Sequence, residues 1–160
     1  MKQSIAILIV VFSSPAWACS FARTTEPFEV NGPGSIEPRR TEFEVAEIVR
    51  GSDDGNPHSC SDAGVITLKA LDPPAETGFI FEVVKGEFED RLFTEEPITP
   101  ADFKEPGEFT FIWLDGSSYE QGPFDIVVQV TPISRTGNVG EPTTLNVSHP
   151  GTKKPWWRFW

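Results

Sequence analysis

Two cysteines are the residues of this sequence best suited to form a covalent cross-link. Cys19 and Cys60 are its only cysteines, and an even count in an oxidising compartment favours one disulfide. Closing the loop between them would stabilise the fold by about 4 kcal/mol if the gain comes from chain entropy. The sequence therefore predicts a Cys19–Cys60 disulfide that ties residue 19 to the loop around residue 60.

The polar loop over residues 51–64 also contains residue types that bind metal ions, namely Asp53, Asp54, His58, Cys60 and Asp62. Hard cations need oxygen ligands at alternating positions, which the run from Asp53 to Asn56 does not supply. Zinc or copper would need further Cys or His ligands, and the only other histidine is His149, far along the chain. We therefore expect a solvated acidic loop, with no metal and no cofactor.

Catalytic chemistry has no recognisable motif in this chain. The sequence contains no G-x-S-x-G elbow, no H-E-x-x-H, no P-loop and no glycine-rich dinucleotide turn. Neighbouring carboxylates occur beside turns, at Glu87, Glu89 and Asp90 and at Glu95 and Glu96. An acid and base pair needs environments that push the two pKa values apart. We expect no catalytic residues, and the alternative hypothesis is an extracytoplasmic hydrolase with an unrecognised carboxylate site.

The C-terminal segment 150–160 is a basic, tryptophan-rich tail. Its cationic and aromatic side chains are Lys153, Lys154, Trp156, Trp157, Arg158, Phe159 and Trp160. Tryptophan with lysine or arginine suits a membrane interface, and aromatic residues with arginine also suit a protein contact. We expect the tail to bind an envelope protein or a membrane surface, and the alternative is that it folds back over an edge of its own domain.

The first 18 residues have the order of a cleavable signal peptide. Lys2 supplies the positive charge, residues 5–12 are apolar, and Ala16-Trp17-Ala18 is a small-x-small cleavage site. The apolar run is too short to cross a bilayer, which needs about 20 residues. Export to the periplasm or the exterior is therefore predicted.

Cys19, directly after this cleavage site, has a competing use as the acylated residue of a bacterial lipoprotein. Trp17 is bulky for a lipobox, and leucine is missing at the position of Ala16. Acylation would also leave Cys60 as an odd thiol. Lipid anchoring through Cys19 is the minority interpretation.

The mature chain would be strongly acidic, with 12 Lys and Arg against 24 Asp and Glu, a formal charge of −12. Such a body repels phosphate backbones and anionic headgroups, and it has no electrostatic footprint for nucleic acid. The 142 residues after cleavage suffice for one domain with its own core.

Short stretches of alternating apolar residues between prolines and glycines predict an all-β chain. The expected strands are 41–49, 65–71, 78–84, 92–94, 108–114, 124–130 and 143–147, with a bulge near Ile48, which lies out of register with Phe43 and Val45. Residues 19–40 are expected to be an extended lead-in with one edge strand at most, and residues 41–149 to form a single antiparallel immunoglobulin-like sandwich.

Two stretches resemble a fibronectin type III domain. Residues 65–83 (VITLKALDPPAETGFIFEV) resemble its strands B and C around a Pro-Pro turn, and residues 124–147 resemble its strands F and G. The resemblance implies a non-enzymatic binding or scaffolding domain. The family's core tryptophan at the end of strand B falls on Ala70 or Leu71, and its strand-F tyrosine falls on Phe124. We expect Trp113 to fill the space beside Ala70.

Overall fold

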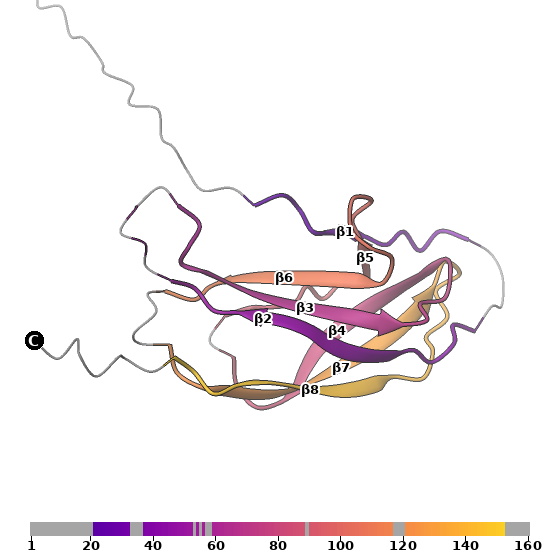
Figure 1. Cartoon of the computed structure of the whole chain (residues 1–160). Coiled ribbons are helices and arrows are strands. Elements are labelled where there is room, and N and C mark those ends of the chain that lie inside the picture. The colour runs from indigo at the N-terminus through magenta and orange to yellow at the C-terminus, as the bar shows by residue number, and fades with distance from the viewer. Residues whose placement is uncertain are drawn as a thin grey trace, which may run out of the picture.

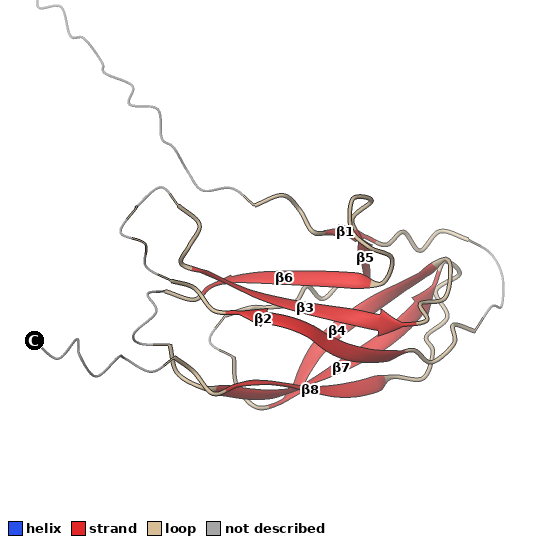
Figure 2. Ribbon diagram, in the orientation of Figure 1, coloured by secondary structure: helices blue, strands red, loops and turns tan. Residues whose placement is uncertain are grey.

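The computed structural model describes residues 21–32, 37–52, 54, 56, 59–88, 90–116 and 121–152. These residues form eight strands and no helix (Figure 2), which confirms the predicted all-β class. Accordingly, the described part of the chain has no helix long and apolar enough to cross a membrane. The strands are β1 (Thr25–Pro27), β2 (Glu42–Val49), β3 (Ala63–Leu71), β4 (Thr77–Lys85), β5 (Ile98–Pro100), β6 (Glu108–Leu114), β7 (Phe124–Ser134) and β8 (Thr143–His149).

Two antiparallel sheets pack face to face as a β-sandwich (Figure 1). One sheet has the strand order β2-β3-β6, and the other has the order β1-β5-β4-β7-β8. Inward residues alternate with outward residues along each strand, because successive side chains of a strand point to opposite faces. In β7, for example, Ile126, Val128 and Val130 are buried while Asp125 is exposed.

The core lies between the sheets and is rich in phenylalanine. Its fully buried large side chains include Ile66 and Leu68 of β3, Phe79 of β4 and Phe109 of β6. Phe79 meets Phe109 edge to face, with ring centroids 5.5 Å apart and ring planes at 82°. Such edge-to-face contacts add to the stabilisation that burial alone provides.

Most predicted strands are observed, and the exceptions are informative. The bulge near Ile48 is confirmed as a register shift between Val45 and Glu47 in the pairing of β2 with β3. Residues 92–94 are not a strand; the short strand β5 forms later, at Ile98–Pro100. The lead-in supplies the edge strand β1, which pairs with β5.

The expectation for Trp113 is wrong. Trp113 pairs with Gly64 at the start of β3, and a Cβ atom on Gly64 would clash with the indole ring. Ala70, near the other end of β3, pairs with Phe43. Phe43 packs edge to face on Phe79 at 5.1 Å. A phenylalanine of β2 therefore lies where the tryptophan was expected.

The two lateral edges of the sandwich are closed differently. On one side β2 and β8 adjoin, and the Thr143 hydroxyl donates a hydrogen bond of 2.9 Å to the carbonyl of Thr41. On the other side the segment between β4 and β5 covers the gap. Its Phe93 contacts Phe81 of one sheet at 5.7 Å and Phe111 of the other at 4.7 Å between ring centroids.

Candidate binding site

A buried ion pair lies at the end of the sandwich where β2 and β6 end. Arg50 follows β2 and Asp115 follows β6, so the sheet order β2-β3-β6 brings both residues to the same end. Arg50 Nε donates to Asp115 Oδ2 and Arg50 Nη2 donates to Asp115 Oδ1, each at 2.7 Å. The two side chains are only 9% and 4% exposed. This bidentate geometry is the strong form of an arginine–carboxylate contact.

The ion pair is also joined to the second sheet. Arg50 Nη1 donates to the carbonyl of Gly122, just before β7, at 3.0 Å. The guanidinium carbon lies 5.4 Å from the centre of the Phe124 ring. On the other side, the Gly51 amide donates to Asp115 Oδ2 at 2.8 Å. Arg50 therefore holds both sheets together at this end.

The pKa of Asp115 shows that its carboxylate is well compensated. Burial alone would raise this pKa, but the hydrogen bonds from Arg50 and the Gly51 amide, with the positive charge of Arg50, outweigh it. The pKa of Asp115 consequently lies below its ordinary value of 3.8. Asp115 is a structural anion and is unsuited to act as a general acid.

Gln121 connects this cluster to the point where the tail departs. Its Nε2 donates to the carbonyls of Gly51 at 2.7 Å and Gly116 at 3.0 Å. Its carbonyl accepts the Thr152 amide at 3.1 Å, and the Thr152 hydroxyl donates to Gln121 Oε1 at 3.3 Å. Gln121 is 6% exposed, so the base of the tail is held by a buried side chain.

His149 fixes the turn that follows it, at residues 150–151. Its Nδ1 accepts hydrogen bonds from Arg50 Nη1 at 3.3 Å and from the Gly151 amide at 3.1 Å, which places the proton of a neutral ring on Nε2. The imidazole stacks on Phe124 at 6.2 Å. Gly151 has φ +78°, a left-handed conformation that favours glycine. Thus the direction in which the chain leaves β8 is set by named contacts.

Beside this anchor the end of the sandwich opens into a cavity of about 660 Å³, which we call the mouth. Its aromatic lining is Phe88, Trp113 and Phe124; the Phe88 ring lies edge to face at 5.4 Å from Trp113 and at 5.1 Å from Phe124. Glu87 and Asp90 add two exposed carboxylates. The mouth therefore offers rings and negative charge next to the base of the tail.

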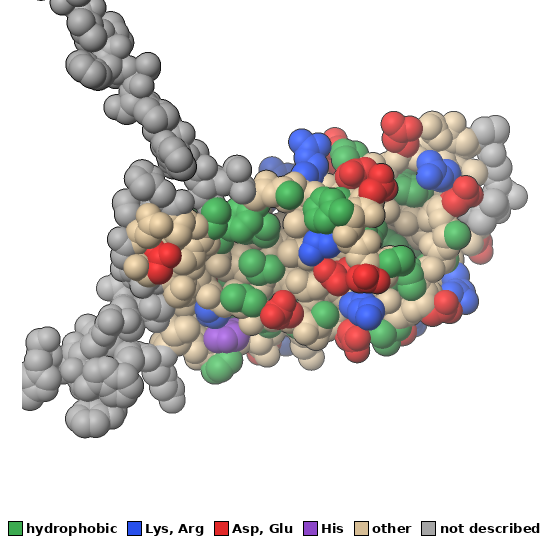
Figure 3. Space-filling model, turned by 45° about the horizontal axis from the view of Figure 1, so that its top comes forward, with side chains coloured by type: hydrophobic (Ala, Val, Ile, Leu, Met, Phe, Trp, Pro, Cys, Tyr) green, Lys and Arg blue, Asp and Glu red, His purple; other side chains and the backbone are tan. Residues whose placement is uncertain are grey.

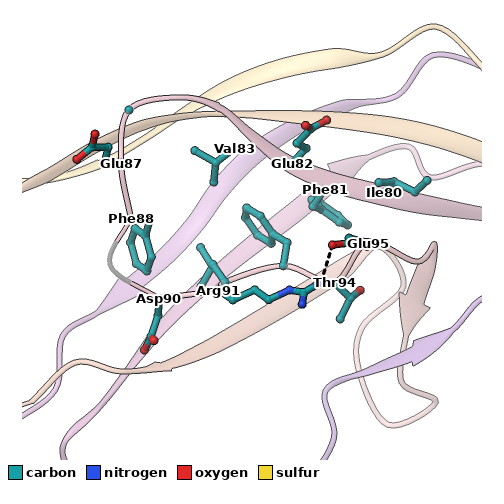
Figure 4. Close-up of a pocket in the computed structure, with 13 residues that line it drawn as sticks. Ile80, Phe81, Glu82, Val83, Glu87, Phe88, Asp90, Arg91, Thr94 and Glu95 are labelled. Atoms are coloured by element: carbon teal, nitrogen blue, oxygen red, sulfur yellow. Dashed lines mark hydrogen bonds and ion pairs between the residues drawn. The ribbon is translucent and has the colours of Figure 1, made fainter.

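A second cavity, of about 800 Å³, runs from the mouth along β4, and we call it the groove (Figure 4). It shares Glu87, Phe88 and Asp90 with the mouth. Figure 4 shows Arg91 reaching along the groove to Glu95, with Nη2 2.9 Å from Oε1. The floor of the groove is β4 itself.

The edge of β4 that faces the groove lacks a partner strand beyond Phe79. Phe79 lies opposite Pro132 of β7, and proline has no N–H, so this pair is of the non-hydrogen-bonded type. The backbone groups of Phe79, Phe81 and Val83 therefore point away from β7. Within β4, Phe79 is the only residue that pairs with β5, and among the described residues no turn or loop hydrogen bond involves the N–H or C=O of Phe81 or Val83.

Exposed apolar side chains gather on the three-stranded sheet near the same end (Figure 3). Val49, the last residue of β2, is 44% exposed, and Leu114, the last residue of β6, is 72% exposed. Between them the half-buried pair Val65 and Ile112 lies on the same outer face. These four residues form an apolar outer patch at the end of the sandwich where Thr152 lies, at the base of the tail.

Several residues predicted to carry function lie outside the described part of the chain. These are Cys19 of the disulfide, Asp53 and His58 of the acidic loop, Glu89, and the tail residues Lys153, Lys154, Trp156, Trp157, Arg158, Phe159 and Trp160. Cys60 lies half-buried in the turn before β3. Among the described residues no three His, Cys, Asp or Glu side chains form a group that could hold a metal ion.

The predicted carboxylate clusters and the observed site overlap only in part. Glu87 and Asp90 line both cavities, whereas Glu95 pairs with Arg91. Sequence reasoning missed Arg50, Asp115 and Gln121. The sequence offered only a weak signal for the ion pair: Arg50 directly follows β2, and Asp115 directly follows β6.

Comparison with known proteins adds no family to this description. No protein-family model matches the chain, and no curated protein or solved structure matches it. The site is therefore interpreted from its geometry and charge.

Proposed function

We propose that this chain is an exported, non-enzymatic binding or scaffolding domain of a bacterial cell envelope, and that its tail, residues 153–160, is the contact element. The observation that carries the proposal is the anchoring of Gly151 and Thr152. Gly151 is hydrogen-bonded to His149 and Thr152 to Gln121, and both partners belong to the buried cluster around Arg50. A tail that begins at a rigid point is presented in a defined direction.

Export is supported by the pattern of residues 1–18, with Lys2, an apolar run and the Ala16-Trp17-Ala18 site. The proposed disulfide between Cys19 and Cys60 fits an oxidising compartment, and no free cysteine occurs among the described residues, which include Cys60. The acidic composition of the mature chain favours solubility there.

The strand order supports a fibronectin type III-like assignment. In immunoglobulin-like sandwiches, strands A, B and E share one sheet, while C, F and G follow one another in the second sheet. β2-β3-β6 and β4-β7-β8 have these orders, with the stretches that resemble B, C, F and G in β3, β4, β7 and β8. β5 pairs with β4 and not with β6, unlike the fourth strand of an antibody constant domain, which belongs to the sheet of strand E.

The tail has the chemistry that the acidic body lacks. Three cations and three tryptophans in eight residues suit the headgroup region of an anionic membrane, or an apolar pocket with an acidic rim on an envelope protein. The body alone would be repelled by anionic lipid, so at a membrane surface the tail would carry the contact.

The test compares the mature protein with a variant that ends at Thr152. The full-length protein should sediment with envelope fractions, and the truncated one should be soluble. Two further variants separate the chemistry: one replaces the tail tryptophans by serine and keeps the cations, and the other replaces the cations and keeps the tryptophans. Unchanged fractionation of the truncated protein would contradict the role of the tail.

Purified components then identify the partner. Sedimentation with phosphatidylglycerol vesicles that depends on both tryptophans and cations, and is absent with phosphatidylcholine vesicles, would identify the membrane surface. Envelope association without vesicle binding would identify a protein. A protein that neither associates with the envelope nor binds vesicles would overturn the proposal.

A further inference from the structure

We propose that the groove beside β4 is a binding site for an extended basic and aromatic peptide, and that its occupant is the chain's own tail, residues 153–160. The inference deepens the proposed function by adding regulation, and it rests on that function only in taking the tail as a contact element. A tail held in the groove would have to leave it before binding an envelope partner.

The backbone of β4 provides the first argument. The register with β7 turns the N–H and C=O groups of Phe81 and Val83 away from that strand and toward the groove, and among the described residues no turn or loop hydrogen bond involves them. Unpaired strand edges are templates for a further strand, and extended peptides bind to such edges through main-chain hydrogen bonds. A peptide laid along β4 would satisfy these groups and extend the sheet where β5 stops.

Charge provides the second argument. Glu82, Glu87 and Asp90 line the groove, are exposed, and have no ion-pair partner among the described residues. Arg91 is the only cation among the described lining residues, and it is already paired with Glu95. The groove therefore selects a ligand with positive charge, and Lys153, Lys154 and Arg158 place three cations in the last eight residues of the chain.

Position provides the third argument. Thr152 is hydrogen-bonded to Gln121, and Gln121 lines the mouth, which leads into the groove past Glu87 and Phe88. Eight extended residues span about 26 Å, enough to pass the mouth and run beside Val83 and Phe81. A tether of this length gives an effective concentration in the millimolar range, which favours the chain's own tail over another ligand.

The aromatic lining suits the same occupant. Phe88 is half-buried and lies where the mouth joins the groove. An indole entering there would make edge-to-face contacts like those that Phe88 already makes with Trp113. Apolar and cationic residues thus find matching surfaces in the order in which the tail would meet them.

The experiment measures amide hydrogen exchange in the mature protein and in the variant that ends at Thr152. We expect the Phe81 and Val83 amides to exchange at least about tenfold more slowly in the full-length protein, because hydrogen-bonded amides exchange only on local opening. A synthetic peptide of residues 153–160 added to the truncated protein should restore this protection. A peptide with serine for its four aromatic residues is the matched control.

Charge reversal locates the peptide on the protein. Glu87→Lys and Asp90→Lys, separately in the truncated protein, should each weaken peptide binding by about tenfold as measured by fluorescence anisotropy. Glu105→Lys, an equally exposed change before β6 at the opposite end of the sandwich, should leave it unchanged. All three positions are exposed, and exchange in the core strands reports whether each variant folds.

The outcomes distinguish the occupants. Protection that is independent of protein concentration supports the chain's own tail, whereas protection that increases with concentration would assign the groove to the tail of a second copy and overturn docking in cis. Binding of the tail in the groove would be contradicted if the Phe81 and Val83 amides exchanged equally fast in both proteins, or if the Val65 and Ile112 amides were protected in their place. Envelope fractionation is measured separately, so the proposed function can stand or fail independently.

Discussion

Arg50 and Asp115 are 65 positions apart in the sequence, yet two parallel hydrogen bonds of 2.7 Å join the guanidinium to the carboxylate. The pair is buried, and Arg50 also reaches the Gly122 carbonyl and the Phe124 ring of the second sheet. One side chain therefore ties together the ends of β2, β6 and β7. The same cluster positions His149 and, through Gln121, the base of the tail.

Replacing Asp115 by alanine should destabilise the domain by about 3 kcal/mol, because it leaves a buried arginine without its counter-ion. The measurement is the free energy of unfolding in urea at neutral pH. Glu141→Ala is the matched control, since it removes an ion pair to Arg40 whose side chains are 49% and 69% exposed. That control should cost less than about 1 kcal/mol. Equal losses for the two variants would contradict the structural role of the buried pair.

Lowering the pH should remove the contribution of Asp115 to the free energy of unfolding. Its pKa in the folded state lies below the ordinary value of 3.8, because hydrogen bonds and the charge of Arg50 outweigh burial. A depressed folded pKa stabilises the fold at pH values above 3.8, and this contribution is lost as the pH falls through the folded pKa. The stability advantage of the wild type over Asp115→Asn should therefore narrow between about pH 5 and pH 2. An advantage that stays constant over this range would contradict the assignment.

The fold was largely predictable from local pattern, because each strand of a sheet with one buried and one solvent-exposed face carries its own alternation of inward and outward residues. Phe124 to Val130 and Ile66 to Ala70 are clear examples, and both form strands. The predicted strand at residues 92–94 is not observed, because only three residues supported that prediction. Their neighbourhood is apolar for another reason: Phe93 packs between Phe81 and Phe111 to close the side of the sandwich.

The site was much less predictable, because its parts come from distant positions that only the register of the sheets brings together. Nothing near Arg50 in sequence indicates Asp115, and nothing near Gln121 indicates Thr152. The unpaired edge of β4 depends on the strand order and on Pro132 lying opposite Phe79. The tail, by contrast, stood out directly because its composition differs so strongly from the rest of the chain.

Gly64→Ala should destabilise the sandwich by about 1–3 kcal/mol, the usual cost of overpacking. A Cβ atom there would clash with the indole of Trp113, which is itself only 8% exposed. Gly122→Ala is the control, because no described residue other than its chain neighbours has an atom within 4 Å of the added Cβ. Urea unfolding gives the magnitude, and the near-ultraviolet circular dichroism should change only in the Gly64 variant. Equal stability of the two variants would mean that Trp113 does not pack against Gly64.

The chemistry at Cys19 is decided by the intact mass of the exported protein. A Cys19–Cys60 disulfide predicts the mass of the chain cleaved after Ala18, less two hydrogens, whereas acylation would add the mass of a lipid. Cys60→Ser should lower the free energy of unfolding by about 4 kcal/mol if the loop-closure estimate applies, and reduction of the wild type should have the same effect. Cys19→Ser is the matched variant, because it breaks the same bond from the other end. Unequal losses for the two serine variants, or a lipid-bearing mass, would contradict the disulfide.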